Sequence, residues 1–122
     1  MSDSIYSQIG GAAAVDAAVD IFYRKVLMDD SISYFFDSID MDTQRSKQKA
    51  FLTMVMGGPN DYTGRDLRTA HAPLVEQGLN ENHFMSVAGH LQATLEELNV
   101  PVELTLAIMN VAASTIDDVL NR

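Results

Sequence analysis

Four polar side chains, Tyr23, Gln44, Gln48 and His71, fall where the apolar spacing of their segments predicts buried residues. Conflicts of this kind between pattern and residue type concentrate at functional sites. A phenol, two amides and an imidazole that shared one cavity would offer movable hydrogen-bond donors inside an otherwise apolar pocket. That is the usual composition of a site for a small ligand.

The two glutamines precede an apolar stripe on the same predicted helix. Stepping back by three and four residues from Phe51 and Leu52 reaches Gln48 and then Gln44, so both amides are expected to face the interior. A buried amide needs a hydrogen-bond partner, because burial without one costs a few kcal/mol. In the alternative, the helix is rotated and both amides meet solvent. Tyr23 likewise has a simpler interpretation, as a core tyrosine with one hydrogen bond.

The histidines differ in where the pattern places them. His71 shares a helical face with Leu67 and Leu74, so its imidazole is expected to point inward. His83 lies in the first turn of a later helix and His90 lies off that helix's main stripe. An inward histidine can simply be a core residue with its hydrogen bonds satisfied. A neutral imidazole facing a cavity that also holds a phenol also suits the single axial ligand of a haem iron.

The composition excludes several other kinds of site. The sequence of 122 residues contains no cysteine, which removes disulfides, zinc knuckles, iron–sulfur clusters, thiolate nucleophiles and haem attached through a CxxCH motif. It contains no HExxH pair for zinc, no GxSxG elbow for a serine nucleophile and no glycine-rich nucleotide loop. Hydrolytic and nucleotide-dependent chemistry therefore has no support from motifs.

Charge and hydropathy narrow the class of partner. Seventeen acidic residues against eight scattered basic ones give a net charge of -9, which disfavours nucleic acid and anionic membrane surfaces. No apolar run approaches the ~20 residues of a transmembrane helix. The first residues lack a basic segment typical of a secretory signal. We expect a cytoplasmic protein without membrane insertion.

Glycine and proline divide the chain into helices, and no segment shows the period-two alternation of a strand. The sequence predicts one all-α domain over residues 1–122 with five or six helices. The predicted helices span residues 4–9, 12–27, 40–56, 66–71, 80–98 and 101–120, with a short turn around 34–36. Pro73 is expected to keep the helix near 66–71 short or kinked. Asp40 and Asn80 are predicted N-caps, and Pro101 is predicted at the first position of the last helix.

Taken in order, these residues resemble the group I truncated haemoglobins, and the resemblance covers nearly the whole chain. Its motifs are Ile5-Tyr6-x-x-Ile9-Gly10-Gly11, Ala14-Val15-x-x-Ala18-Val19-Asp20-x-Phe22-Tyr23, Phe35-Phe36, Gln44-Arg45-x-x-Gln48-Lys49-Ala50-Phe51-Leu52, Gly57-Gly58, Tyr62-x-Gly64-Arg65 and Arg68-x-Ala70-His71. Each fragment is weak alone, but together they are highly specific.

The resemblance implies a two-over-two helical sandwich around a non-covalent b-type haem. It assigns His71 as the proximal iron ligand and Tyr23, Gln44 and Gln48 as distal residues that stabilise a bound ligand. The apolar haem contacts that it implies are Phe36, Phe51, Leu52, Leu67 and Phe84. The last helix ends Ser114-Thr115-Ile116-Asp117-Asp118 without a histidine, so the haem–histidine crosslink of some relatives is not expected there.

The resemblance also implies reversible binding of O2, NO or CO, with NO dioxygenation as the first expected activity. The ferric product of that reaction must be reduced again. Because the chain has no flavin or nicotinamide motif, a separate reductase is expected. Storage, sensing and peroxidase-like activity remain alternatives.

Lys47 faces the haem side of its predicted helix and has two interpretations. Its long side chain could reach a haem propionate. It could instead lose its proton and bind iron as a sixth ligand, because burial lowers the pKa of a lysine; an electron-transfer or sensor haem protein would result. In the remote alternative, the chain is a haem-free helical interaction module with satisfied polar residues in its core.

Overall fold

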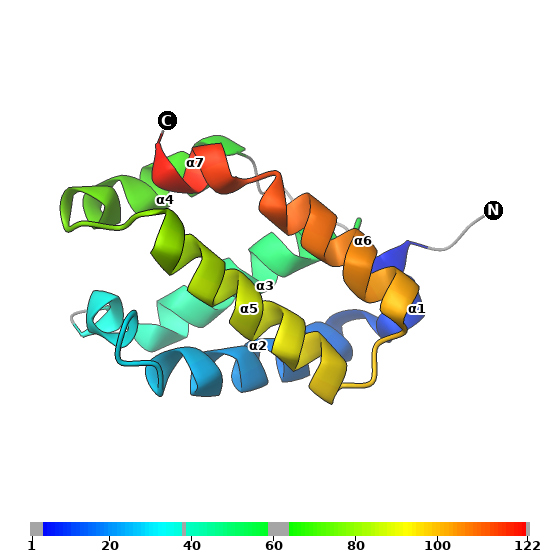
Figure 1. The fold of residues 1–122 in the computed structure, drawn as a ribbon. Helices are drawn as coiled ribbons and strands as arrows, with labels where there is room; N and C mark the ends of the chain where they lie inside the picture. The colour runs from blue at the N-terminus through cyan, green and yellow to red at the C-terminus, as the bar shows by residue number, and fades with distance from the viewer. Residues whose placement is uncertain (1–3, 38, 59–63, 122) are drawn as a thin grey trace.

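The computed structural model of the protein describes residues 4–37, 39–58 and 64–121, with the backbone alone at 64–67 and 70. Within these ranges every regular element is helical, as the sequence predicts (Figure 1). The elements are α1 (Ile5–Ile9), α2 (Gly11–Leu27), the 3₁₀ helix η1 (Ser33–Phe36), α3 (Met41–Val55), α4 (Gly64–Glu76), α5 (Glu81–Glu97), α6 (Val102–Ala113) and α7 (Ile116–Leu120).

The long helices form two pairs that cross. Helix α2 packs against α3, α5 packs against α6, and α5 also packs across α2. Figure 1 shows α5 and α6 running diagonally across the α2–α3 pair, while α4 and α7 lie together at one end. The inner faces of α2, α3, α4 and α5 therefore converge on one region between the pairs.

Side chains from several helices are completely removed from water where the pairs meet. Val15 and Val26 of α2, Leu52 of α3, Leu95 of α5 and Ile108 of α6 all have 0% exposure. Full burial of an aliphatic side chain of this size contributes roughly 1.5–3 kcal/mol, so these contacts hold the crossing angle of the pairs. None of the helices in the described ranges is both long and apolar enough to cross a bilayer.

The predicted N-caps of α3 and α5 are confirmed. The Asp40 carboxylate accepts hydrogen bonds from the Asp42 backbone N–H at 3.2 Å and from the Thr43 hydroxyl at 2.7 Å. The Asn80 side chain accepts from the His83 backbone N–H at 3.3 Å. Each cap satisfies backbone donors that have no partner inside the helix, which fixes where the two helices begin.

The helix around Pro73 is longer than predicted. Helix α4 continues to Glu76, past Pro73, instead of ending near His71. Proline removes the one hydrogen bond that its own N–H would donate. The Pro73 carbonyl still accepts from the Gln77 N–H at 3.2 Å, and α4 packs along α7, so the helix survives the loss.

The predicted helix over residues 101–120 is wrong, because it is two helices, α6 and α7. Two hydroxyls bond back to carbonyls at the break: Ser114 Oγ donates to the Val111 carbonyl at 2.5 Å, and Thr115 Oγ1 to the Ala112 carbonyl at 2.6 Å. Such bonds compete with the helical ladder. Pro101 is also one position earlier than predicted, at the N-cap of α6.

Candidate functional site

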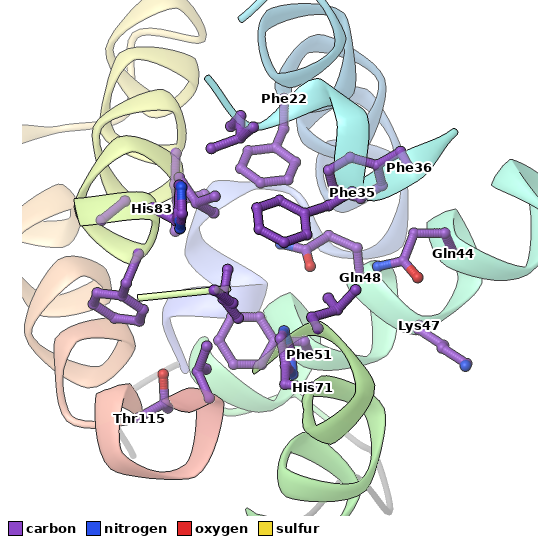
Figure 2. Close-up of a pocket in the computed structure, with 18 of the residues that line it drawn as sticks. Phe22, Phe35, Phe36, Gln44, Lys47, Gln48, Phe51, His71, His83 and Thr115 are labelled. Carbon is purple, nitrogen blue, oxygen red and sulfur yellow. The ribbon is translucent and has the colours of Figure 1, made fainter. Parts of the chain in front are cut away.

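A cavity lies between the inner faces of α2, η1, α3, α4 and α5, and reaches the start of α7 (Figure 2). The empty space between its walls, which includes open solvent at the mouth, is about 1030 Å³. Carbon surface dominates the wall. The apolar lining consists of Phe22, Ile32, Phe35, Phe36, Phe51, Leu74, Leu79, Phe84, Val87, Ala88, Leu91, Ala112 and Val119.

The structure brings the predicted polar residues to this cavity. Tyr23, Gln44, Gln48 and His71 all line it, and so does Lys47. Gln44 and Gln48 are half-buried, so the alternative in which both amides simply face solvent does not describe this structure. The glutamines come from α3 and the histidine comes from α4, which places donors on two different walls.

Tyr23 is joined to α3 by its hydroxyl group. The Gln44 side-chain amide donates to Tyr23 Oη at 3.1 Å, and Tyr23 Oη donates a long 3.5 Å bond to the Gln44 carbonyl. The Tyr23 side chain is 1% exposed. Its ring meets the rings of Phe22 and Phe36 edge-on, with centroid distances of 5.1 and 5.9 Å. Packing and hydrogen bonding together fix the phenol at the wall of the cavity.

His71 is a half-buried residue of α4, and its side chain lines the cavity (Figure 2). Within the described residues, no group of three His, Asp or Glu side chains is arranged to hold a metal ion. A flat apolar cofactor that needs one axial imidazole fits both the wall and the donor set.

Three of the five apolar residues that were predicted to contact the cofactor line the cavity. Phe36, Phe51 and Phe84 line the cavity. Leu52 is not in the lining; it is fully buried in the core between the helix pairs. The side chain of Leu67 lies outside the described residues.

Lys47 stands at the exposed edge of the cavity. Its side chain is exposed, and Figure 2 shows its ammonium group directed away from His71. This placement keeps the charge in water while the methylene groups border the pocket, as long basic side chains commonly do.

Sequence reasoning missed His83 and Thr115, which both line the cavity. The Asn80 N–H donates to His83 Nδ1 at 3.0 Å, so neutral His83 carries its hydrogen on Nε2. Its ring lies 5.1 Å from that of Phe35. The Asn-x-x-His spacing at the start of α5 could have indicated the position of His83, because this spacing is compatible with a capping box. His90, in contrast, lies 2.7 Å from the Asp29 carboxylate and is not part of the lining.

A sequence model of the family described as bacterial-like globin matches residues 4–121. The chain belongs to the bacterial-like globins. It is 49% identical to a group 1 truncated haemoglobin from Synechocystis sp., with 98% of each chain covered. A group 1 truncated haemoglobin from Tetrahymena pyriformis is 44% identical, with 93% of this chain and 88% of the relative covered. The expected family is therefore confirmed.

Solved structures agree with the fold of this globin. The 2/2 haemoglobin from Synechococcus sp. PCC 7002, in the cyanomet state and with covalently attached haem, superposes with a TM-score of 0.93. It is 44% identical, with 98% of this chain and 100% of that chain covered. The crossed α2–α3 and α5–α6 pairs are thus the predicted two-over-two globin sandwich. Membership of the family supports binding of haem and, through it, of a diatomic ligand.

Proposed function

We propose that this globin holds a b-type haem in the cavity through His71 and binds O2, NO or CO reversibly on the side that Tyr23 faces. One observation carries the proposal: the same cavity has the imidazole of α4 in one wall and the Tyr23–Gln44 hydrogen-bonded pair in another. When bound, haem supplies an iron at which a diatomic ligand gains negative charge. The chain has to supply one axial ligand, hydrogen-bond donors and an apolar enclosure.

The donors suit a ligand that carries negative charge. Tyr23 can exchange its long bond to the Gln44 carbonyl for a shorter one to the ligand, and the Gln44 amide can keep the phenol oriented meanwhile. Hydrogen bonds to charged acceptors are about twice as strong as those between neutral groups. These bonds should therefore slow the release of O2 more than the release of CO, which is less polar. Gln48 is placed to offer a further amide from the next turn of α3.

A relative offers independent support for these three residues. Crystal structures of the Tetrahymena pyriformis protein include one variant with Tyr replaced by Phe and two with Gln replaced by Glu. The substituted positions there are separated by 21 and 4 residues. Tyr23, Gln44 and Gln48 have the same separations here. We assign the distal role to them on this spacing and on their place in the cavity.

We propose that the haem is held without a covalent bond, although the Synechococcus relative has covalently attached haem. The chain has three histidines. Besides His71, His83 accepts a hydrogen bond from Asn80 and His90 pairs with Asp29. Neither α6 nor α7 contains a histidine. We therefore expect acid and an organic solvent to extract the haem completely.

The activity we favour is NO dioxygenation, in which NO, O2 and one electron yield nitrate. A separate cytoplasmic reductase would supply the electron. The electron-transfer alternative requires Lys47 to turn inward and bind the iron, and the exposed position of its side chain does not favour this. We also propose that residues 1–122 form one globin domain, supported by the match of the family over residues 4–121.

Absorption spectra of the haem-reconstituted chain, ferric and ferrous, test the proposal directly. His71→Gly should lose the signature of an axial histidine, and added imidazole should restore it. His90→Gln is the matched control, because it removes an imidazole that does not line the cavity. Haem that fails to bind in a one-to-one ratio, or a spectrum that His71→Gly leaves unchanged, would overturn the proposal and favour the helical interaction module.

A further inference from the structure

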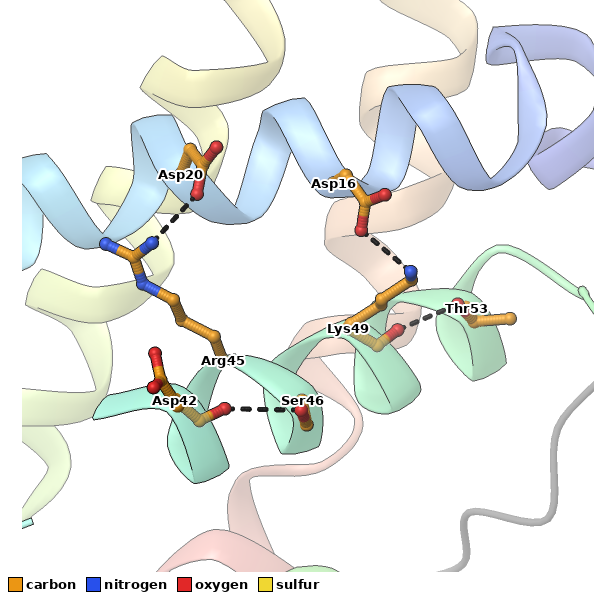
Figure 3. Close-up of polar contacts among 7 residues, drawn as sticks. All are labelled: Asp16, Asp20, Asp42, Arg45, Ser46, Lys49 and Thr53. Carbon is orange, nitrogen blue, oxygen red and sulfur yellow. Dashed lines mark hydrogen bonds and ion pairs between the residues drawn. The ribbon is translucent and has the colours of Figure 1, made fainter. Parts of the chain in front are cut away.

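Two ion pairs bridge α2 and α3 outside the cavity (Figure 3). Arg45 Nη1 lies 3.1 Å from Asp20 Oδ1, and Lys49 Nζ lies 2.8 Å from Asp16 Oδ1. The carboxylates are one turn apart on α2 and the cations one turn apart on α3, in opposite chain order. The pairs are therefore two parallel links between antiparallel helices, and we call them the outer rungs.

The outer rungs and the Gln44–Tyr23 hydrogen bond form one series of links between α2 and α3, and this series ends at the cavity. Tyr23 lies three residues after Asp20 on α2, and Gln44 directly precedes Arg45 on α3. The Gln44–Tyr23 hydrogen bond is thus the next link between the same two helices. Any rotation or sliding of α3 that breaks the outer rungs also moves the amides of Gln44 and Gln48 relative to the phenol.

Buried side chains hold the second half of α3 but not the first. The buried residues of this helix, Leu52, Thr53 and Val55, all lie in its last turns. The first half, residues 41–48, has Met41 as its one aliphatic residue. Gln44, Lys47 and Gln48, which line the cavity, belong to this weakly packed half. Contacts other than the hydrophobic core must fix its orientation.

We propose that the outer rungs position the first half of α3 and so set how well Tyr23 and Gln44 retain a bound ligand. Asp16, Asp20, Arg45 and Lys49 are then positioning residues, since none of them lines the cavity. The inference rests on the proposed function, because it assigns the consequence to ligand release. The Asp16 carboxylate also hydrogen-bonds Lys49 and raises the pKa of that ammonium, which keeps the rung charged.

Ligand release from the haem-reconstituted chain tests this role. Asp16→Asn combined with Asp20→Asn neutralises the acidic side of both rungs. Exposed ion pairs are individually weak, so we expect O2 dissociation to quicken by about two- to fivefold, with little change for CO. Salt screens such pairs. Wild-type O2 release should therefore accelerate from low to high ionic strength, and the double variant should lose this dependence.

Glu97→Gln is the matched control, because Glu97 pairs with Lys25 of α2 at 3.2 Å but belongs to α5. It should leave both the O2 rate and its salt dependence as in the wild type. A further variant exchanges the charges of one rung, Asp20→Arg with Arg45→Asp. Because the pair is re-formed, its O2 dissociation rate should lie within about twofold of the wild-type rate. Any of three results would overturn the positioning role. The O2 dissociation rate could stay unchanged in the double aspartate variant, Glu97→Gln could raise it equally, or the charge-exchanged variant could fail to keep a rate near that of the wild type.

Failure of the proposed function gives a different result. The wild type itself would then bind neither O2 nor CO. In that case the side-chain amide signals of Gln44, followed by NMR, decide the structural part of the inference. They should shift in the double aspartate variant and stay in place in Glu97→Gln; signals that do not move in the former would overturn it.

Discussion

Gln44 and Tyr23, which are 21 residues apart in sequence, are joined by a 3.1 Å hydrogen bond from the amide to the phenol oxygen. The bond connects α3 to α2 at the wall of the cavity, and the tyrosine that accepts it is almost fully buried. An amide can present either its oxygen or its nitrogen. Here the amide nitrogen donates, so the phenol hydrogen, which makes a long 3.5 Å bond to the Gln44 carbonyl, can turn toward a bound ligand instead.

Tyr23→Phe should therefore quicken O2 release. A hydrogen bond to a charged acceptor contributes about 1.5–3 kcal/mol, and a factor of ten corresponds to about 1.4 kcal/mol. We expect the O2 dissociation rate to rise about tenfold or more, and the CO rate to change far less. Stopped-flow ligand replacement measures both. Tyr34→Phe, at an exposed tyrosine, is the control; an O2 rate that Tyr23→Phe leaves unchanged would remove Tyr23 from the mechanism.

The parts of the fold that were predictable depend on local chemistry. The caps at Asp40 and Asn80 and the buried stripe of α2 need only side chains close in sequence, so the sequence predicts them correctly. The inward placement of Gln44, Gln48 and His71 also follows from helical spacing. The family resemblance was still needed to relate these residues to haem.

The features that the sequence did not predict depend on competing hydrogen bonds and on packing between helices, which the spacing of apolar residues does not reveal. The break between α6 and α7 arises because hydroxyls of Ser114 and Thr115 bond to backbone carbonyls, and their residue types alone are compatible with a continuous helix. Helix α4 passes Pro73 because α7 packs along it. His83 reaches the cavity wall through its bond to Asn80, which depends on ring orientation.

Gly58→Ala should destabilise the fold at the end of α3. A Cβ there would lie 2.7 Å from Tyr6 Cγ and 2.8 Å from Thr53 Cγ2. Overpacking of this kind costs about 1–3 kcal/mol, which should lower the urea midpoint. Gly89→Ala is the control, because nothing lies within 4 Å of its added Cβ and alanine gains about 0.8–1 kcal/mol over glycine inside a helix. Equal midpoints for the two variants would contradict the close packing of Tyr6.

Asp29 should make stability depend on acid pH. Its carboxylate accepts from the Ser31 hydroxyl at 2.7 Å and from the Ser31 N–H at 3.0 Å, and lies 2.7 Å from His90 Nε2. These bonds, that of the Ser31 hydroxyl foremost, lower the pKa of Asp29 from 3.8 to about 2. Because the folded pKa lies below the unfolded one, ionised Asp29 stabilises the fold above about pH 4, and this contribution is lost as the pH falls toward 2.

Asp29→Asn removes that titration. The difference in unfolding free energy between the wild type and this variant should be larger at about pH 6 than at about pH 3, as urea titrations at both pH values can measure. Asp30→Asn, at the exposed neighbouring carboxylate, corrects for general charge effects. A wild-type advantage over Asp29→Asn that stays constant between the two pH values would show that the Asp29 bonds do not drive the acid dependence.

Lys47→Ala should leave the ferric absorption spectrum of the haem-reconstituted protein unchanged up to alkaline pH. The Lys47 side chain is exposed and its ammonium points away from His71. It is therefore placed to pair with a propionate of a bound haem at the mouth of the cavity rather than with the iron. Loss of such an exposed pair, worth up to about 1 kcal/mol, should instead quicken haem transfer to an acceptor protein by up to about fivefold. Lys25→Ala, at a lysine outside the cavity lining, should change neither quantity. If low-spin bands present in the alkaline wild type disappear in Lys47→Ala, the lysine binds the iron and the electron-transfer alternative gains its first support.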